Sequence, residues 1–323
     1  MKPLFASTIV GCALLLAACD KPTAPKSTDT SQASTSDKTV IATTTMIADM
    51  AASLSPEGVQ VKSIMQPGGD PHLHQPTPGD AKMVARSDMV LTNGLHLEGW
   101  IDDLVRNAGG TRDVVVVSQG VKPIAMEGSP GGVDPHFWFD LSAWKQASLT
   151  TSDALIKLVG AQTPQAAQIK RKTAAYTARL DALKAWSAKN LESIPRQQRV
   201  LVTSHDAFNY FGRGFGIQVK GIQGSSTEQE ASPRDVANII ELVRANKVPA
   251  IFIESSVNPS LIKQVSRETG VKAMGPLFSD SLGPKGSGAD TYEGMIQENV
   301  RLITQGLGGT YSPFVPPTDP KTP

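Results

Sequence analysis

The chain has 323 residues, of which 31 are Lys or Arg and 30 are Asp or Glu, so its formal net charge is +1. This balance lacks the basic excess that marks nucleic-acid-binding proteins, and we expect no nucleic-acid partner. Apolar residues make up 40% and aromatic residues 5% of the chain, which is typical of a soluble α/β protein. The length is sufficient for two lobes of ordinary domain size.

The N-terminus has the layout of a secretory signal peptide. A short basic start precedes an apolar run over residues 4–18, which is too short to span a membrane comfortably. The small residues before Cys19 resemble the lipobox of bacterial lipoproteins, in which the cysteine is lipidated and becomes the first mature residue. We therefore expect a signal peptide over 1–18 and a periplasmic or otherwise extracytoplasmic protein held to the membrane by lipid on Cys19. Asp20 resembles an inner-membrane retention signal of Gram-negative lipoproteins.

Both cysteines of the chain, Cys12 and Cys19, fall in this N-terminal segment. Cys12 leaves with the signal peptide and Cys19 would carry lipid, so the folded part has no thiol for a disulfide or a thiolate metal site. Any metal ion would have to be held by His and carboxylate side chains.

Two series of short strands alternate with helices along the rest of the chain. Residues 19–38 are rich in Ser, Thr, Lys and Pro and predict a disordered tether. The first series forms an N-terminal lobe over 39–160, with strands at 39–43, 59–65, 89–92 and 114–117 and helices at 78–86 and 98–107. The second forms a C-terminal lobe over 197–310, with strands at 199–203, 219–222, 250–253 and 271–274 and helices at 207–215, 233–245, 259–268 and 292–305. A Pro-rich tail covers 311–323.

Strands that alternate with helices at this spacing predict parallel sheets built from βαβ units. Between the two series, a linker over 161–196 contains a long helical pattern at 163–194. Thr163 suits the N-cap, Pro164 suits the first helical position, and Pro195 ends the pattern. We therefore predict an α/β fold of two lobes with parallel sheets flanked by helices, joined by one long rigid α-helix of roughly 45 Å. A helix packed wholly within one lobe is the alternative.

Four residues with metal-binding side chains stand in turn-like segments: His72 in "DPHLH", His136 in "DPHFWFD", His205 in "TSHDAF" and Asp280 in "FSDSLG". His205 is expected just beyond the end of a strand, and His72 and Asp280 in loops that follow strands. Ligands of open α/β sheets gather at the carboxyl ends of the strands. Each lobe supplies two of the four residues, which predicts a metal site in the cleft between the lobes.

The repeated Asp-Pro-His supports this interpretation. Proline fixes its own φ and restricts the aspartate before it, so the histidine extends from a stiffened turn. A preorganised ligand loses less entropy when it coordinates a metal ion.

Seven segments together resemble one family of proteins. They are "GGDPHLHQPTPGD", "NGLHLEGW", "DPHFWFD", "TSHDAFNYF", "IQGSSTEQEASPRD", "IFIESSV" and "ADTYEGMIQENV". They resemble the cluster A-I solute-binding proteins of ABC transporters, which are zinc- and manganese-uptake lipoproteins, over about residues 39–307. The resemblance implies two α/β lobes joined by one long helix, a monomer without enzymatic activity, one divalent ion as cargo and an ABC permease as partner. Within it, His72 and His136 match the first-lobe ligands, His205 the third ligand and Asp280 the closing carboxylate.

The donor set is informative about the metal. Three imidazoles and one carboxylate suit Zn²⁺ and accept Mn²⁺ or Fe²⁺, and the excess of nitrogen favours zinc slightly because Mn²⁺ lies lowest in the Irving–Williams order. The loop before the second ligand, however, lacks the histidines that zinc-specific members often carry. The sequence leaves zinc and manganese both open.

Several other residues stand near these segments, and two other functions fit parts of the sequence. His74 is expected to be a loop histidine outside the site, His96 to lie near the cleft rim, and Trp100 and Trp138 to be packing residues. A metallohydrolase that uses the His72-x-His74 pair is the first alternative function, but catalytic zinc keeps a position open for water. A surface adhesin of the same lipoprotein family is the second alternative.

Overall fold

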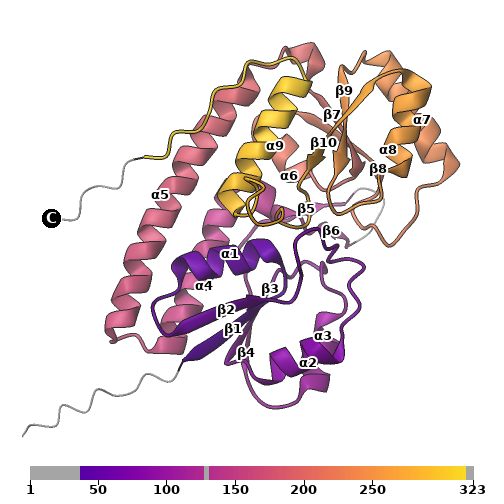
Figure 1. Ribbon diagram of the computed structural model, residues 1–323. Helices are drawn as coiled ribbons and strands as arrows, with labels where there is room; N and C mark the ends of the chain where they lie inside the picture. The colour runs from indigo at the N-terminus through magenta and orange to yellow at the C-terminus, as the bar shows by residue number, and fades with distance from the viewer. Residues whose placement is uncertain (1–36, 127–130, 318–323) are drawn as a thin grey trace, which may run out of the picture. The chain divides into compact units, whose positions relative to one another are not determined.

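The computed structural model describes residues 37–126 and 131–317 (Figure 1). The predicted signal peptide, Cys19 and nearly all of the predicted tether lie outside these residues. Among the helices that the structure describes, none has the length and apolarity needed to cross a membrane.

A four-stranded parallel sheet forms the first half of the fold. Its strands are β1 (Lys38–Ala42), β2 (Val59–Ser63), β3 (Met89–Thr92) and β4 (Asp113–Val116), in the order β2-β1-β3-β4. Val40 packs with the core that contains helix α1 (Thr45–Leu54), whereas its neighbour Ile41 packs with the cluster of α2 (Pro78–Ala85) and α3 (Ile101–Ala108). This alternation follows from the two-residue period of a strand and puts helices on both faces of the sheet.

The second half repeats the βα alternation. Strands β7 (Val200–His205) and β8 (Gln218–Gln223) pair in parallel, as do β9 (Ala250–Glu254) and β10 (Lys272–Leu277), and β7 lies against β9. The helices of this half are α6 (Asn209–Phe215), α7 (Pro233–Ala245), α8 (Ser260–Thr269) and α9 (Tyr292–Gly306). The parallel strands agree with the sequence prediction.

The long helix α5 (Pro164–Glu192) connects the two halves. As predicted, Thr163 is its N-cap: the Thr163 side chain accepts a hydrogen bond from the backbone N–H of Ala166 at 3.2 Å, and Pro164 occupies the first turn. Its 29 residues give a length of about 43 Å. The helix packs against α1 and α4 (Leu141–Val159) of the first half and against α9 of the second, so it contacts both halves (Figure 1).

Several elements differ from the sequence prediction. Helices α1 and α4 were not among the predicted helices, and residues 117–136 contain a small antiparallel hairpin of β5 (Ile124–Ala125) and β6 (Val133–Asp134) rather than only a loop. The helix predicted at 98–107 begins at Ile101. Glu98 is instead a buried side chain that accepts hydrogen bonds from the backbone N–H groups of Asn93 and Gly94, which holds this segment in a turn. Two short 3₁₀ helices, η1 (Phe137–Phe139) and η2 (Arg196–Gln198), complete the described elements.

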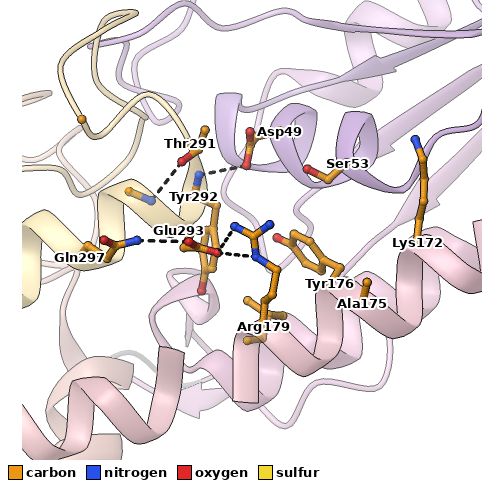
Figure 2. A pocket seen from close by; sticks show the side chains of 13 residues that line it. Asp49, Ser53, Lys172, Ala175, Tyr176, Arg179, Thr291, Tyr292, Glu293 and Gln297 are labelled. Carbon is orange, nitrogen blue, oxygen red and sulfur yellow. Dashed lines mark hydrogen bonds and ion pairs between the residues drawn. The ribbon is translucent and has the colours of Figure 1, made fainter. Parts of the chain in front are cut away.

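Direct contacts fasten helix α9 to both α1 and α5 (Figure 2). The Asp49 carboxylate of α1 accepts a hydrogen bond from the backbone N–H of Tyr292, the first residue of α9, at 2.9 Å. Arg179 of α5 forms an ion pair with Glu293 of α9, with a nitrogen-to-oxygen distance of 2.7 Å. A cavity of about 600 Å³ lies among these helices. The two halves are therefore joined by side-chain contacts as well as by the chain.

Candidate metal centre

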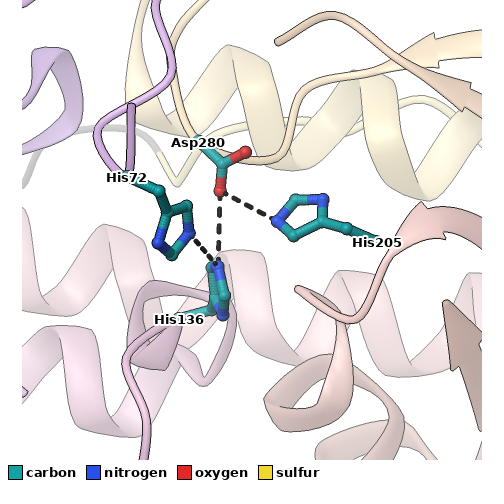
Figure 3. A group of neighbouring side chains, drawn as sticks. All are labelled: His72, His136, His205 and Asp280. Carbon is teal, nitrogen blue, oxygen red and sulfur yellow. Dashed lines mark hydrogen bonds and ion pairs between the residues drawn. The ribbon is translucent and has the colours of Figure 1, made fainter. Parts of the chain in front are cut away.

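Four candidate ligands from separate parts of the chain converge on one point (Figure 3). His72 lies in the loop after β2, His136 follows β6, His205 is the last residue of β7, and Asp280 lies in the loop after β10. One ligand atom from each residue lies within 4.8 Å of those of the other three. His205 thus ends its strand rather than following it, a shift of the predicted strand end by two residues. The structure brings together all four residues that the sequence singled out.

The spacing of the donor atoms suits a single tetrahedral ion. Nε2 of His72 lies 3.3 Å from Nε2 of His136, and Oδ1 of Asp280 lies 3.5 Å from Nε2 of both His136 and His205. Four donors about 2.0–2.1 Å from a zinc ion are separated by roughly 3.3–3.4 Å along the edges of their tetrahedron. These three separations are close to the tetrahedral edges, and the other donor pairs lie within 4.8 Å.

The Asp-Pro-His segments form the stiff turns that the sequence predicts. Oδ1 of Asp70 accepts a hydrogen bond from the backbone N–H of His72 at 2.9 Å, and Oδ1 of Asp134 accepts one from the backbone N–H of His136, also at 2.9 Å. Each aspartate therefore closes an Asx-turn two residues ahead of itself. The same local device fixes the backbone of two ligands.

Buried carboxylates orient two of the imidazole rings. Nδ1 of His136 lies 2.8 Å from Oδ1 of Asp134, and Nδ1 of His205 lies 2.6 Å from Oε2 of Glu254. A carboxylate at Nδ1 keeps the ring proton there and leaves the Nε2 lone pair free for a metal ion. Glu254 also accepts the backbone N–H of His205 at 2.8 Å, so it fixes both the ring and the strand end.

Asp280 presents one oxygen to the centre and is held by the other. Its Oδ2 accepts hydrogen bonds from Ser256 Oγ at 2.7 Å and Ser279 Oγ at 3.0 Å. Its Oδ1 and Nε2 of His205 are buried and have no hydrogen-bond partner among the described residues. Buried polar atoms without partners are costly in a folded protein. A cation between them would satisfy both.

The electrostatics of the centre favour a positive charge. Burial alone would lower the pKa of His205, but the negative charges of Glu254 and Asp280 raise it well above its usual value. Burial likewise works against protonated His136, yet Asp134 raises its pKa. Burial would raise the pKa of Asp280, but His205 and His136 hold it well below its usual range.

His72 behaves differently from the other two histidines. Its pKa is lowered to about 3 because burial and the neighbouring His136 both disfavour its charged form. It is therefore a neutral donor at any physiological pH. It is also the most exposed of the four side chains, at 9% against 0–1% for the others.

The remaining residues that the sequence singled out lie outside the cluster. Nε2 of His74 lies 3.4 Å from Oδ2 of Asp80, and its ring centroid lies 4.6 Å from that of Trp100. The His72-x-His74 pair therefore does not converge on one point. His96 is exposed and lines a cavity together with His72.

The two tryptophans pack around the ligand loops, as the sequence suggested. Trp138 is fully buried, and its Nε1 donates a hydrogen bond to the carbonyl of Ser279 at 2.9 Å. Trp100 Nε1 donates one to the carbonyl of Pro71 at 2.9 Å. Each indole thus holds the residue next to a candidate ligand.

Sequence reasoning did not identify the residues that support the ligands. Asp134, Glu254, Ser256 and Ser279 were not predicted to have a role. Asp134 could have been found from its place in the second Asp-Pro-His, since the first aspartate of that segment is suited to an Asx-turn. Glu254 has no comparable local signal, because its partner His205 lies on a different strand.

The comparisons with known proteins agree with this geometry. The sequence model of a protein family described as zinc-uptake complex component A, periplasmic, matches residues 40–306. The chain belongs to this family. The manganese-binding lipoprotein MntA of Bacillus subtilis is 39% identical over 276 residues, which cover 83% of this chain and 89% of that protein. The zinc-binding protein TroA of Treponema pallidum is 38% identical over 275 residues, covering 83% of this chain and 88% of that protein.

A solved structure extends the similarity to the fold. The periplasmic zinc-binding protein TroA of Treponema pallidum superposes with a TM-score of 0.79 and 35% sequence identity, over 84% of this chain and 99% of that chain. The family resemblance and the α/β fold with one long helix are thereby confirmed. As a member of this family the chain is a metal-binding transport protein and not an enzyme, so the hydrolase alternative is wrong.

Proposed function

We propose that this chain captures one divalent transition-metal ion outside the cytoplasm and delivers it to the permease of an ABC importer. His72, His136, His205 and Asp280 are the proposed ligands. The observation that carries the proposal is the convergence of four buried donor atoms within 4.8 Å of one another, with three of their separations at 3.3–3.5 Å. Relatives named as manganese ABC transporter substrate-binding lipoproteins support the delivery step.

Within this proposal, zinc is slightly favoured over manganese, with Fe²⁺ also accepted. Three nitrogen donors and one oxygen donor in a closed, four-coordinate arrangement suit Zn²⁺ better than Mn²⁺. The relatives do not separate the two metals, since one named for manganese and one named for zinc are 39% and 38% identical to this chain. The preference therefore rests on the donor set alone.

The proposal also covers how the protein is held at the membrane. Residues 1–18 are removed as a signal peptide and Cys19 is lipidated. A tether over 19–38 then connects the lipid to the N-terminal lobe at 39–160. A linker over 161–196 joins this lobe to the C-terminal lobe at 197–310, and a tail over 311–323 follows. A family described as periplasmic and relatives named as lipoproteins support this location, and Asp20 favours the inner membrane. Cys19→Ser should release the protein from isolated membranes into the soluble fraction, and continued membrane attachment would contradict the anchor.

The ligand set is tested by replacing one proposed ligand and one histidine outside the cluster. His205→Ala should lower zinc affinity by at least about 100-fold, because the site loses a donor and leaves Glu254 unpaired. His74→Ala is the matched control and should keep wild-type stoichiometry, since His74 lies outside the cluster. Isothermal titration of chelator-stripped protein measures both. An unchanged affinity in His205→Ala would remove His205 from the site.

The metal preference needs a separate measurement. Elemental analysis of protein purified without added metal, followed by competition between Zn²⁺ and Mn²⁺, should give tighter binding of zinc. Metal at about 1,000 times its Kd should also add about 4 kcal/mol to the free energy of unfolding. Absence of a thermal shift with either ion would overturn the proposed function as a whole.

A further inference from the structure

A cavity of about 310 Å³ opens beside the candidate metal centre, and His72 forms part of its wall. The other three proposed ligands do not line it. At roughly 30 Å³ for each water, the six waters of a hydrated divalent ion occupy about 180 Å³. The cavity is therefore large enough to admit an ion before it loses its water. We call this cavity the vestibule.

Besides His72, three of the side chains that line the vestibule can bind metal ions. They come from three segments: His96 from the loop after β3, Met126 beside the β5–β6 hairpin, and Glu228 from the loop after β8. His96 and Glu228 are exposed. The imidazole of His96 makes no hydrogen bond and no ion pair with any described residue, so no polar contact with the protein accounts for its position.

The loop that carries His96 has an unusual backbone. Gly94, Leu95 and His96 have consecutive positive φ values of 77°, 54° and 63°, and only one other non-glycine residue in the described ranges, Lys247, has a positive φ. This conformation costs roughly 1–2 kcal/mol per non-glycine residue. Buried Glu98 stabilises it through the N–H groups of Asn93 and Gly94, at 2.7 and 3.2 Å. Strained backbone maintained in this way is concentrated at functional sites.

We propose that His96 captures the incoming metal ion in the vestibule, assisted by Glu228, and passes it to His72. This inference rests on the proposed function of the four-residue centre and adds an entry step to it. His72 is suited to receive the ion because it is the most exposed of the four ligands, at 9%, and lines the same cavity. The described residues contain one group of three or more convergent metal-ligating side chains, and His96 is not in it. The capture is therefore transient.

A transient capture site has a specific kinetic consequence. His96 contacts the ion on the way in and on the way out but does not hold it in the final complex. Its removal must therefore slow association and dissociation by the same factor and leave Kd unchanged. A fifth ligand of the centre would instead change Kd through the dissociation rate.

The test uses His96→Asn in the full-length protein. Asparagine adopts a positive φ more readily than most residues, so the loop is retained while the imidazole is removed. Zn²⁺ is the probe. An indicator dye follows its association with the protein after rapid mixing. Its dissociation rate is measured in the presence of excess chelator, at several chelator concentrations, and extrapolated to zero chelator. His74→Asn controls for the loss of a histidine outside the site. Both rate constants should fall about tenfold in His96→Asn and remain at wild-type values in the control.

Glu228→Gln tests the capture step independently if His96→Asn folds poorly. It should slow association, and the difference should disappear at high salt because the contribution is electrostatic. An unchanged association rate constant in a folded His96→Asn protein would overturn the capture step. So would a higher Kd that comes from faster dissociation alone. Either result leaves the proposed function intact, whereas wild-type protein that binds neither Zn²⁺ nor Mn²⁺ overturns both.

Discussion

Glu254 offers a sharp test of how the centre is built, because it contacts a proposed ligand without being one. Its side chain is fully buried, lies 2.6 Å from Nδ1 of His205 and accepts the backbone N–H of the same residue at 2.8 Å. In Glu254→Gln the side-chain oxygen can still accept the backbone N–H. The amide nitrogen would then face Nδ1 of His205 and favour the tautomer that carries its proton on Nε2, where the metal ion should bind.

The expected loss can be bounded in two ways. A net charge-assisted hydrogen bond in a buried site is worth about 1.5–3 kcal/mol. Loss of a carboxylate behind a metal-binding histidine lowers metal affinity by about 10–100-fold, or roughly 1.4–2.7 kcal/mol. The two ranges agree. We therefore expect Zn²⁺ affinity at pH about 8 to fall 10–100-fold.

The pH dependence distinguishes this mechanism from general damage. In the wild type, Glu254 helps to raise the pKa of His205, so protons compete with the metal ion below that raised pKa. The substitution lowers this pKa, and competition then begins at a lower pH. The deficit in affinity should therefore shrink as the pH falls from about 8 to about 6.

Isothermal titration at several pH values measures both effects. Glu241→Gln, an exposed substitution of the same type on α7, is the control and should bind like the wild type at each pH. Wild-type affinity in Glu254→Gln, or a deficit that does not change with pH, would refute the proposed role of Glu254.

Four further predictions concern the metal centre and the contacts that join the two halves of the fold. The gain in Tm on adding Zn²⁺ should grow from pH about 6 to about 8, because protons occupy His136 and His205, whose pKa values are raised, at the lower pH. Asp49→Ala should cost about 1–2 kcal/mol in urea unfolding, since the backbone N–H of Tyr292 loses its acceptor. Gly221→Ala should cost about 1–3 kcal/mol and weaken zinc binding, because the new Cβ would lie 2.5 Å from the peptide bond after His205. Solution scattering should show only a small difference between metal-free and loaded protein, because α5 packs against both halves.

An unchanged free energy of unfolding in Asp49→Ala would show that its carboxylate does not stabilise the start of α9. Gly214→Ala is the control for the glycine variant: no atom lies within 4 Å of its added Cβ, and its place in α6 makes alanine neutral or favourable. Equal effects of the two alanine substitutions would show that the strand end tolerates the extra atom. A Tm gain independent of pH would contradict proton competition, and a large closure in scattering would contradict a stiff connection.

The sequence predicted the parts of the fold whose pattern is local. The strands of both halves and the helix α5 have a clear periodicity of apolar residues and clear residues at their ends. Thr163 and Pro164 mark the start of α5 within one residue. Helix α4 was missed because its buried face contains Ser148, Thr151 and Ser152, which read as loop residues. In the structure one of these groups finds a partner in another element, since Thr173 of α5 donates a hydrogen bond to Ser152 Oγ at 2.9 Å.

In the candidate metal centre, too, the locally encoded parts could be predicted and the parts that depend on tertiary contacts could not. The four proposed ligands stand in short segments that can be recognised one at a time, and the family resemblance groups them. The support of His205 could not be predicted, because Glu254 is a strand end 49 residues away, and only the adjacency of β7 and β9 brings the two together. Similarly, Asp280 depends on Ser256, which belongs to the loop after β9. Local chemistry identifies ligands, whereas their orientation depends on tertiary contacts.

The four donors are spread along the chain from His72 to Asp280, on both sides of α5. An ion bound to them would cross-link four distant segments, as a disulfide links two, in a part of the chain that contains no cysteine. Disulfides that close loops of about 100 residues contribute several kcal/mol by restricting the unfolded chain. Here the cross-link would also be the cargo. Each delivery would therefore return the protein to its less restrained state, in which proteases of the same compartment could distinguish an empty carrier from a loaded one.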